Sequence, residues 1–130
     1  MGRDATTTGV NAAAAVVAAL QAGLGVAGGA IAWLAWERWD AMSFAAGAGC
    51  ALAGTVAYAL CAAAASRGKG GRIVRAHLLA ELAKVAVSVT LLVAGLAGQF
   101  TAAFYVAGFG AGVLVYPLAL LLVNRKMDSN

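Results

Sequence analysis

The sequence predicts an all-α membrane protein, a bundle of four transmembrane helices with both termini in the cytoplasm. Three observations predict this fold class. Hydrophobic residues make up 63% of the 130 residues and charged residues only 11%, and the mean hydropathy is +0.88. Four apolar segments each reach the length of about 20 residues that a helix needs to cross the hydrocarbon core. The charges lie mainly between these segments, where they orient a chain in the membrane.

The apolar segments define one membrane domain over residues 11–126. The predicted spans cover residues 11–36, 42–65, 76–97 and 99–123. Residues 1–10 and 127–130 are expected to form short cytoplasmic tails. The segments are too long for membrane strands, and the first is longer than the apolar region of a signal peptide. We therefore interpret all of them as retained helical spans.

The charges of the connecting segments predict the orientation. The turn after the first span is net negative and contains Glu37, Arg38 and Asp40. The segment between the second and third spans is basic and contains Arg67, Lys69, Arg72 and Arg75. Because positively charged loops stay in the cytoplasm, the basic loop and both termini are expected there. The opposite interface is expected to carry an aromatic belt of Trp33, Trp36 and Trp39.

The basic loop has two interpretations. It sets the topology, as most such loops do, or it also contacts anionic lipid or an acidic cytoplasmic partner. Nucleic-acid binding is not expected, because no helix carries a basic face of useful length. A disulfide is not expected either, because Cys50 and Cys61 lie about 16 Å apart along one predicted helix.

Small residues in the spans predict close helix packing. The glycines at helical spacings are Gly25, Gly29, Gly47, Gly54, Gly108 and Gly112. In membranes such residues let helix backbones approach closely, either within one chain or against another membrane protein. The spacing alone does not distinguish these alternatives. Pro117, in the fourth span, cannot donate a hydrogen bond to the Val113 carbonyl and should kink that helix.

The third span carries a charged pair inside the predicted membrane region. Glu81 and Lys84 are three residues apart and share a helix face with His77 and Ser88. Lys84 lies about 12 Å beyond Ala76, close to the bilayer midplane. A lysine at the helix centre raises the free energy of membrane insertion by roughly 2.5–3.5 kcal/mol. We therefore expect either that other interactions offset this cost or that the charge has a function.

Two uncharged polar residues fall at a similar depth. Gln21 and Thr55 each lie about ten residues from the cytoplasmic end of their spans. With Glu81 and Lys84 they are expected to form one polar layer in the cytoplasmic half of the bundle. An intramembrane charge is a candidate functional site by default. The alternative is a structural ion pair between Glu81 and Lys84 that fixes helix packing.

Catalysis is not expected from these residues. The chain has one histidine, and it lacks paired acids, a nucleotide-binding motif and metal-ligand spacing. We therefore expect no enzyme activity, no cofactor and no resident metal.

Two short stretches and the loop pattern carry a resemblance to a known family. AELAK, at residues 80–84, is similar to a Gly/Ala-Glu-x-x-Lys motif in a third span. SFAAGAGCALAGTVAYAL, at residues 43–60, has a Ser-x-x-x-Gly opening and an aromatic-Ala ending. With the basic loop and the short turn after the third span, these features resemble the ATP synthase protein I family of four-span bacterial membrane proteins. Where that family often carries Pro-Asn, this chain has Gly54 and Thr55, which keep a polar group without the amide.

The resemblance implies a non-enzymatic accessory protein of the bacterial inner (cytoplasmic) membrane. Such a protein would assist the assembly or stability of the ring of c subunits in the membrane sector of the F-type ATP synthase. The alternative that the family implies is a small Mg²⁺ or Ca²⁺ transporter or channel. Because Glu81 is the one intramembrane acid per chain, a transport site would require a homo-oligomer. The resemblance supplies the partner, whose helix carries an acidic residue in mid-membrane. From charge we expect either that Lys84 pairs with this acid or that the Glu81–Lys84 pair exchanges partners with it, with Thr55 and Gln21 as further partner-binding residues.

Overall fold

The computed structural model describes the backbone of residues 4–65 and 72–128, and the side chains of residues 12–64, 74–119 and 121. Within these ranges the chain forms four helices and no strand. The helices are α1 (Asp4–Ala35), α2 (Arg38–Ala65), α3 (Arg72–Leu96) and α4 (Ala102–Asp128). The all-helical prediction is thus confirmed for the described part of the chain.

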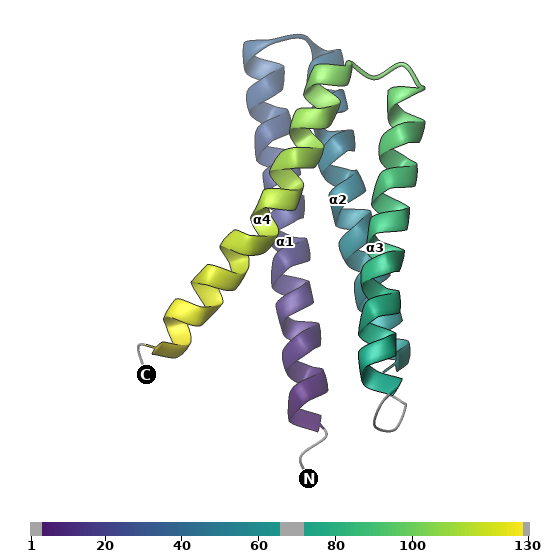
Figure 1. Ribbon diagram of the computed structural model, residues 1–130. Coiled ribbons are helices and arrows are strands. Elements are labelled where there is room, and N and C mark those ends of the chain that lie inside the picture. Colours follow the sequence, from purple (N-terminus) through teal and green to yellow (C-terminus); the bar gives the residue numbers. More distant parts are fainter. Residues whose placement is uncertain (1–3, 66–71, 129–130) are drawn as a thin grey trace.

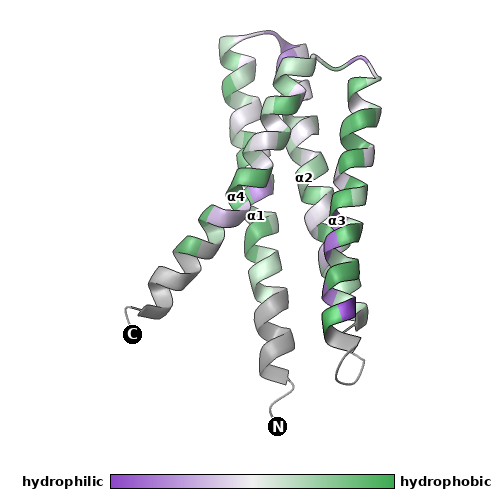
Figure 2. Ribbon diagram, viewed as in Figure 1, coloured by the Kyte–Doolittle hydropathy of each residue, from purple (hydrophilic) through white to green (hydrophobic). Residues whose placement is uncertain are grey.

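Each of the described helices is long and apolar enough to cross a membrane. The candidate spans are Ala12–Ala35, Arg38–Ala64, Val74–Leu96 and Ala102–Ala119. Figure 2 shows hydrophobic residues along every helix, with hydrophilic positions gathered in the lower half of α3. A helix satisfies its own backbone hydrogen bonds, which lipid requires of any spanning segment. The chain is therefore a multi-pass membrane protein with a helical bundle.

The helices extend beyond the predicted spans at several ends. α1 begins at Asp4, inside the expected N-terminal tail, and α4 continues to Asp128. α2 begins at Arg38, so that only Trp36 and Glu37 separate it from α1. An apolar run marks the part of a helix that lies in lipid, whereas the helical hydrogen bonds continue through polar residues beyond it.

The helices run alternately up and down, with α2 at the centre. Figure 1 shows the α1–α2 connection and the α3–α4 loop at one end of the bundle. The start of α1, the end of α2, the start of α3 and the end of α4 point toward the other end. α2 contacts α1, α3 and α4 extensively, whereas α3 and α4 contact each other least. The bundle is therefore organised around one helix.

Glycines bring α2 and α4 into backbone contact. A Cβ atom at Gly47 would overlap the carbonyl oxygen of Tyr105, and a Cβ atom at Gly108 would overlap that of Phe44. Gly112, one turn further along α4, is also buried against α2. Only hydrogen fits at these positions, so glycine sets the distance between the two helices.

The other predicted packing glycines lie in the remaining contacts of α2. Gly25 and Gly29 of α1 face alanines of α2, and a Cβ atom at Gly25 would lie 3.3 Å from the Cβ of Ala48. Gly54 lies against α3, where a Cβ atom would overlap the hydroxyl of Ser88. All six predicted glycines are buried in contacts between helices of this chain.

Polar and aromatic side chains hold the α3–α4 loop against the start of α2. The hydroxyl of Ser43, a fully buried residue, donates to the Trp39 carbonyl at 2.8 Å and accepts from the Thr101 amide at 2.9 Å. The indole of Trp39 donates to the Gln99 carbonyl at 2.7 Å and stacks on Phe100. These contacts occupy residues 99–101, so α4 begins at residue 102, later than predicted.

The tryptophans of the predicted belt lie at this same end. Trp33, Trp36 and Trp39 are 60%, 58% and 43% exposed. Trp36 packs edge-on against Phe104 with the ring centroids 5.4 Å apart, and the Arg38 guanidinium lies 5.6 Å from the Trp33 ring. Amphipathic rings that are partly packed and partly exposed are typical of a membrane interface.

The C-terminal end of α4 leads away from the bundle. α4 is a continuous helix that contains Pro117. Figure 1 shows α4 crossing in front of α1 and then leading away from the other helices. Pro117 lacks the amide hydrogen that would bond to the Val113 carbonyl, and the kink expected there stays a prediction. Tyr116, which directly precedes the proline, lines the candidate site.

Candidate functional site

A glutamine on α1 links three helices near the middle of the bundle. Gln21 is 2% exposed, and its Nε2 donates to the Gly112 carbonyl of α4 at 3.0 Å. Its Oε1 accepts from the Thr55 hydroxyl of α2 at 2.8 Å. The structure thus brings together two residues of the predicted polar layer. Both side chains are paired, as burial in a lipid environment requires.

Lys84 reaches across the bundle from α3 to α4. Its Nζ lies 4.0 Å from the centroid of the Tyr116 ring, in cation–π geometry. No carboxylate oxygen of a residue with a described side chain, Glu81 included, lies within 4.0 Å of this ammonium. The ion pair that the spacing of Glu81 and Lys84 offers is therefore not formed. The two residues share a helix face, but the long lysine side chain turns toward the ring instead.

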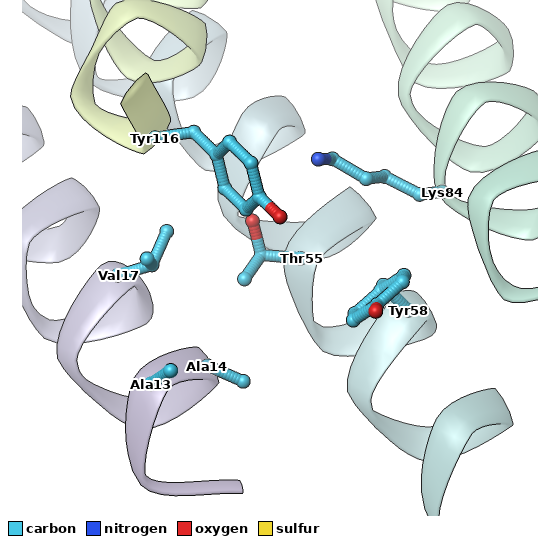
Figure 3. A pocket seen from close by; sticks show the side chains of 7 residues that line it. All are labelled: Ala13, Ala14, Val17, Thr55, Tyr58, Lys84 and Tyr116. Carbon is cyan, nitrogen blue, oxygen red and sulfur yellow. The ribbon is translucent and has the colours of Figure 1, made fainter. Parts of the chain in front are cut away.

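The Lys84 side chain lines a cavity of about 160 Å³. Figure 3 shows its lining residues: Ala13, Ala14 and Val17 of α1, Thr55 and Tyr58 of α2, Lys84 of α3, and Tyr116 of α4. One wall is made of the small apolar side chains of α1. The opposite wall carries the ammonium and the hydroxyl groups. We refer to this space as the Lys84 cavity.

The Lys84 cavity lies deep in the membrane region. The α3 span begins at Val74, and about ten residues of helix rise about 15 Å, half of a hydrocarbon core of about 30 Å. A lysine at this depth raises the free energy of membrane insertion by roughly 2.5–3.5 kcal/mol. The Tyr116 ring offsets part of this cost, since a desolvated cation–π contact contributes up to about 2 kcal/mol. An anion in the cavity would offset the remainder.

His77 and Glu81 lie toward the N-terminal end of α3 from Lys84. The Tyr58 hydroxyl and His77 Nδ1 are 2.9 Å apart, and the two rings meet edge to face. His77 thus contacts the cavity wall through Tyr58. Glu81 is half-buried and does not line the cavity. The structure therefore joins Lys84 and Thr55 at one site and leaves Glu81 outside it.

A second buried network connects α2, α3 and α4 closer to the α3–α4 loop. The Tyr105 hydroxyl donates to the Leu91 carbonyl at 2.7 Å. The Cys50 sulfur lies 2.9 Å from the same hydroxyl oxygen and 3.3 Å from the Ala46 carbonyl oxygen. Ser88 donates to the Cys50 carbonyl at 3.4 Å. These bonds fix the packing of the helices.

Two aromatic residues of the Lys84 cavity, Tyr58 and Tyr116, are not among the residues predicted from the sequence. Tyr58 is three residues after Thr55, and Tyr116 is four residues after Gly112. At these spacings each tyrosine shares a helix face with a residue that points into the bundle. This spacing is the signal that could have located them.

The predicted basic loop is described only at its end. Arg67 and Lys69 lie outside the described residues, as does the side chain of Arg72, where α3 begins. Arg75 is exposed. A role of this loop in lipid or partner binding stays a prediction.

Among the residues with described side chains, no group of three or more His, Cys, Asp or Glu is placed to hold a metal ion. Comparisons of the chain with models of protein families, with curated proteins and with solved structures found no match. Function is therefore inferred from the Lys84 cavity and from the motif resemblance.

Proposed function

We propose that this chain is a non-enzymatic accessory protein that binds c subunits of the F-type ATP synthase and assists the assembly or stability of their ring. The motif in α3 and the stretch in α2 that resemble the ATP synthase protein I family support the choice of partner. The same resemblance supports the bacterial cytoplasmic membrane as its location.

The observation that carries the proposal is the ammonium of Lys84, which lies at mid-membrane depth without an anionic partner among the described side chains. A charge that serves packing alone would be expected to pair within the chain, because an unpaired charge in lipid is costly. The resemblance implies a partner whose helix carries an acidic residue at the same depth. The two charges are complementary, so docking would remove the cost of both.

We further propose that both termini face the cytoplasm. The ends of the helices that adjoin the basic segment lie together at one end of the bundle, with the described ends of α1 and α4. The tryptophans lie at the opposite end. By the positive-inside rule, the basic end is the cytoplasmic end.

Affinity purification from mild detergent tests the choice of partner. We expect c subunits to co-purify with the wild-type chain and to be lost with Lys84→Met and with the double variant Glu81→Gln/Lys84→Met. Both variants should reach normal membrane levels, because removing a buried charge leaves no unpaired group behind. Val85→Met is the matched control, since Val85 is 56% exposed at the same depth and outside the cavity. Full co-purification with the double variant would refute the proposal.

A different outcome would indicate an architectural pair. If Glu81 and Lys84 interact only to stabilise the fold, each single substitution should lower the membrane level and the double substitution should restore it. Co-purification would then follow the membrane level of each variant. One experiment with Glu81→Gln, Lys84→Met and the double variant distinguishes the two patterns.

A further inference from the structure

Two polar groups of the Lys84 cavity can still donate a hydrogen bond to a ligand, the ammonium of Lys84 and the hydroxyl of Tyr116. The Thr55 hydroxyl hydrogen is already used on Gln21, and the Tyr58 hydroxyl is at hydrogen-bonding distance from His77. Among the residues with described side chains, the Tyr116 ring is the one interaction partner of the Lys84 ammonium, and the Tyr116 hydroxyl has no hydrogen-bond partner there. Figure 3 shows the ammonium extending toward that ring. The cavity thus offers a positive charge and a hydroxyl donor to a ligand.

The opposite wall of the cavity limits the shape of a ligand. It is formed by Ala13, Ala14 and Val17, which offer neither charge nor hydrogen-bonding side-chain groups. The volume of about 160 Å³ is close to that of a cavity of about 150 Å³ that takes up one benzene molecule. A ligand that fits this volume and these walls would have a narrow apolar stem and at most one small anionic head.

The depth of the cavity selects among anions. Lys84 lies near the bilayer midplane. Phospholipid phosphates stay at the headgroup level, about 15 Å away from the midplane. A carboxyl group on a fatty acid chain or on a helix side chain can reach that depth. We infer that the Lys84 cavity is a binding site for a single carboxylate carried on a narrow apolar stem, held by the ammonium of Lys84 and the hydroxyl of Tyr116. This inference deepens the proposed function. That the c subunit carries the carboxylate rests on the proposed function.

A free acid tests the site without any partner protein. The full chain in detergent is titrated with octanoate carrying ¹³C at its carboxyl, followed by NMR, and 1-octanol serves as the uncharged analogue. We expect octanoate to bind at least about tenfold more tightly than octanol, and Lys84→Met to weaken octanoate binding by about tenfold or more. Val85→Met should bind as wild type does, which controls for partition into the micelle. Tyr116→Phe, which keeps the ring, should weaken binding by about fivefold, the effect of one hydrogen bond.

A steric variant tests whether the ligand occupies the cavity itself. Ala14→Phe places a phenyl ring where the stem would lie and should abolish octanoate binding without removing any polar group. Ala15→Phe is the matched control, because Ala15 is exposed on the same helix and does not line the cavity. Equal loss in both variants would indicate misfolding, which helix content by circular dichroism would reveal, and Tyr116→Phe would then decide.

A second arm distinguishes the source of the carboxylate. An apolar transmembrane peptide with one central Glu is compared with the same peptide carrying Gln, by co-purification with the tagged chain. Binding of the Glu peptide assigns the carboxylate to a partner helix, and binding of octanoate alone assigns it to a free acid; either result supports the site. If neither acid prefers wild type over Lys84→Met, the inference is wrong.

The inference and the proposed function fail separately. If octanoate or the Glu peptide binds at Lys84 but c subunits do not co-purify with wild type, the carboxylate site stands and the proposed partner is wrong. If c subunits co-purify equally with wild type and Ala14→Phe, and neither acid binds, the carboxylate site is wrong and the proposed partner is still supported.

Discussion

The contact between α2 and α4 predicts opposite effects for glycines only two residues apart. A Cβ atom at Gly47 or Gly108 would overlap a backbone carbonyl oxygen of the facing helix, whereas one at Gly49 or Gly110 would meet nothing within 4 Å. The overlapped atoms belong to the backbone, so no side-chain rotation relieves them. Alanine at Gly47 or Gly108 must therefore push the two helices apart.

The magnitude follows from two opposing terms. Replacing a glycine by alanine inside a helix contributes about 1 kcal/mol of stability. A separation of roughly 1 Å forfeits a quarter to a half of the dispersion energy across the contact, and overpacking of a tight core typically costs 1–3 kcal/mol. We expect Gly47→Ala and Gly108→Ala to lower stability by up to about 2 kcal/mol net. Gly49→Ala and Gly110→Ala should be neutral or stabilising by up to about 1 kcal/mol.

Unfolding of the purified protein in mixed micelles with rising SDS fraction, followed by circular dichroism, measures the difference. The double variant Gly47→Ala/Gly108→Ala should lose less than the sum of the single losses, since one displacement of α4 relieves both overlaps. Equal midpoints for Gly47→Ala and Gly49→Ala would refute the backbone contact. Strict additivity in the double variant would show that the two glycines act at independent contacts.

Further predictions concern the polar contacts, the topology and transport. Gln21→Ala removes the hydrogen bonds to the Thr55 hydroxyl and to the Gly112 carbonyl, so the same SDS assay should show a loss of about 1–3 kcal/mol; an unchanged midpoint would contradict the bridge. Tyr105→Phe removes one buried hydroxyl and should cost about 1 kcal/mol, and a gain in stability would contradict its role in the network. In a background without native cysteines, a cysteine at Gln99 should react with an impermeant reagent outside intact cells and one at Ser66 should not; the reverse would overturn the orientation. Proteoliposomes with this protein alone should pass no Mg²⁺ or protons above empty vesicles, and flux abolished by Glu81→Gln would favour a transporter.

The fold was predictable because its signals, apolar composition and the spacing of small residues, extend over whole helices. An apolar run of about 20 residues identifies a span whatever its neighbours are. Likewise, small residues at helical spacing mark a contact face, and the predicted Gly47 and Gly108 meet across one such contact. The helix ends were less predictable, because Asp4 and Asp128 lie in helices that continue past the apolar runs.

The site was only partly predictable. Depth along each span placed Gln21, Thr55 and Lys84 at one level, and the structure joins the first two by a hydrogen bond. The partner of Lys84 could not be read from spacing, because a lysine side chain is long enough to reach a different helix. Its contact with Tyr116 depends on how α4 crosses the bundle. The pattern of residues along α3 contains no information about the direction in which α4 crosses the bundle.

The bridge made by Gln21 has a consequence for how the chain is assembled during synthesis. Helices emerge in order, so α1 and α2 can pair, and Thr55 can satisfy one end of the amide, before α4 exists. The other end, Nε2, has to wait for the Gly112 carbonyl of the last helix. An unsatisfied donor in lipid is costly, so the incomplete bundle carries a penalty that only the arrival of α4 in the correct register removes. We therefore expect a chain truncated before α4 to be less stable in the membrane than the full chain, because the Gln21 amide would lack the Gly112 carbonyl.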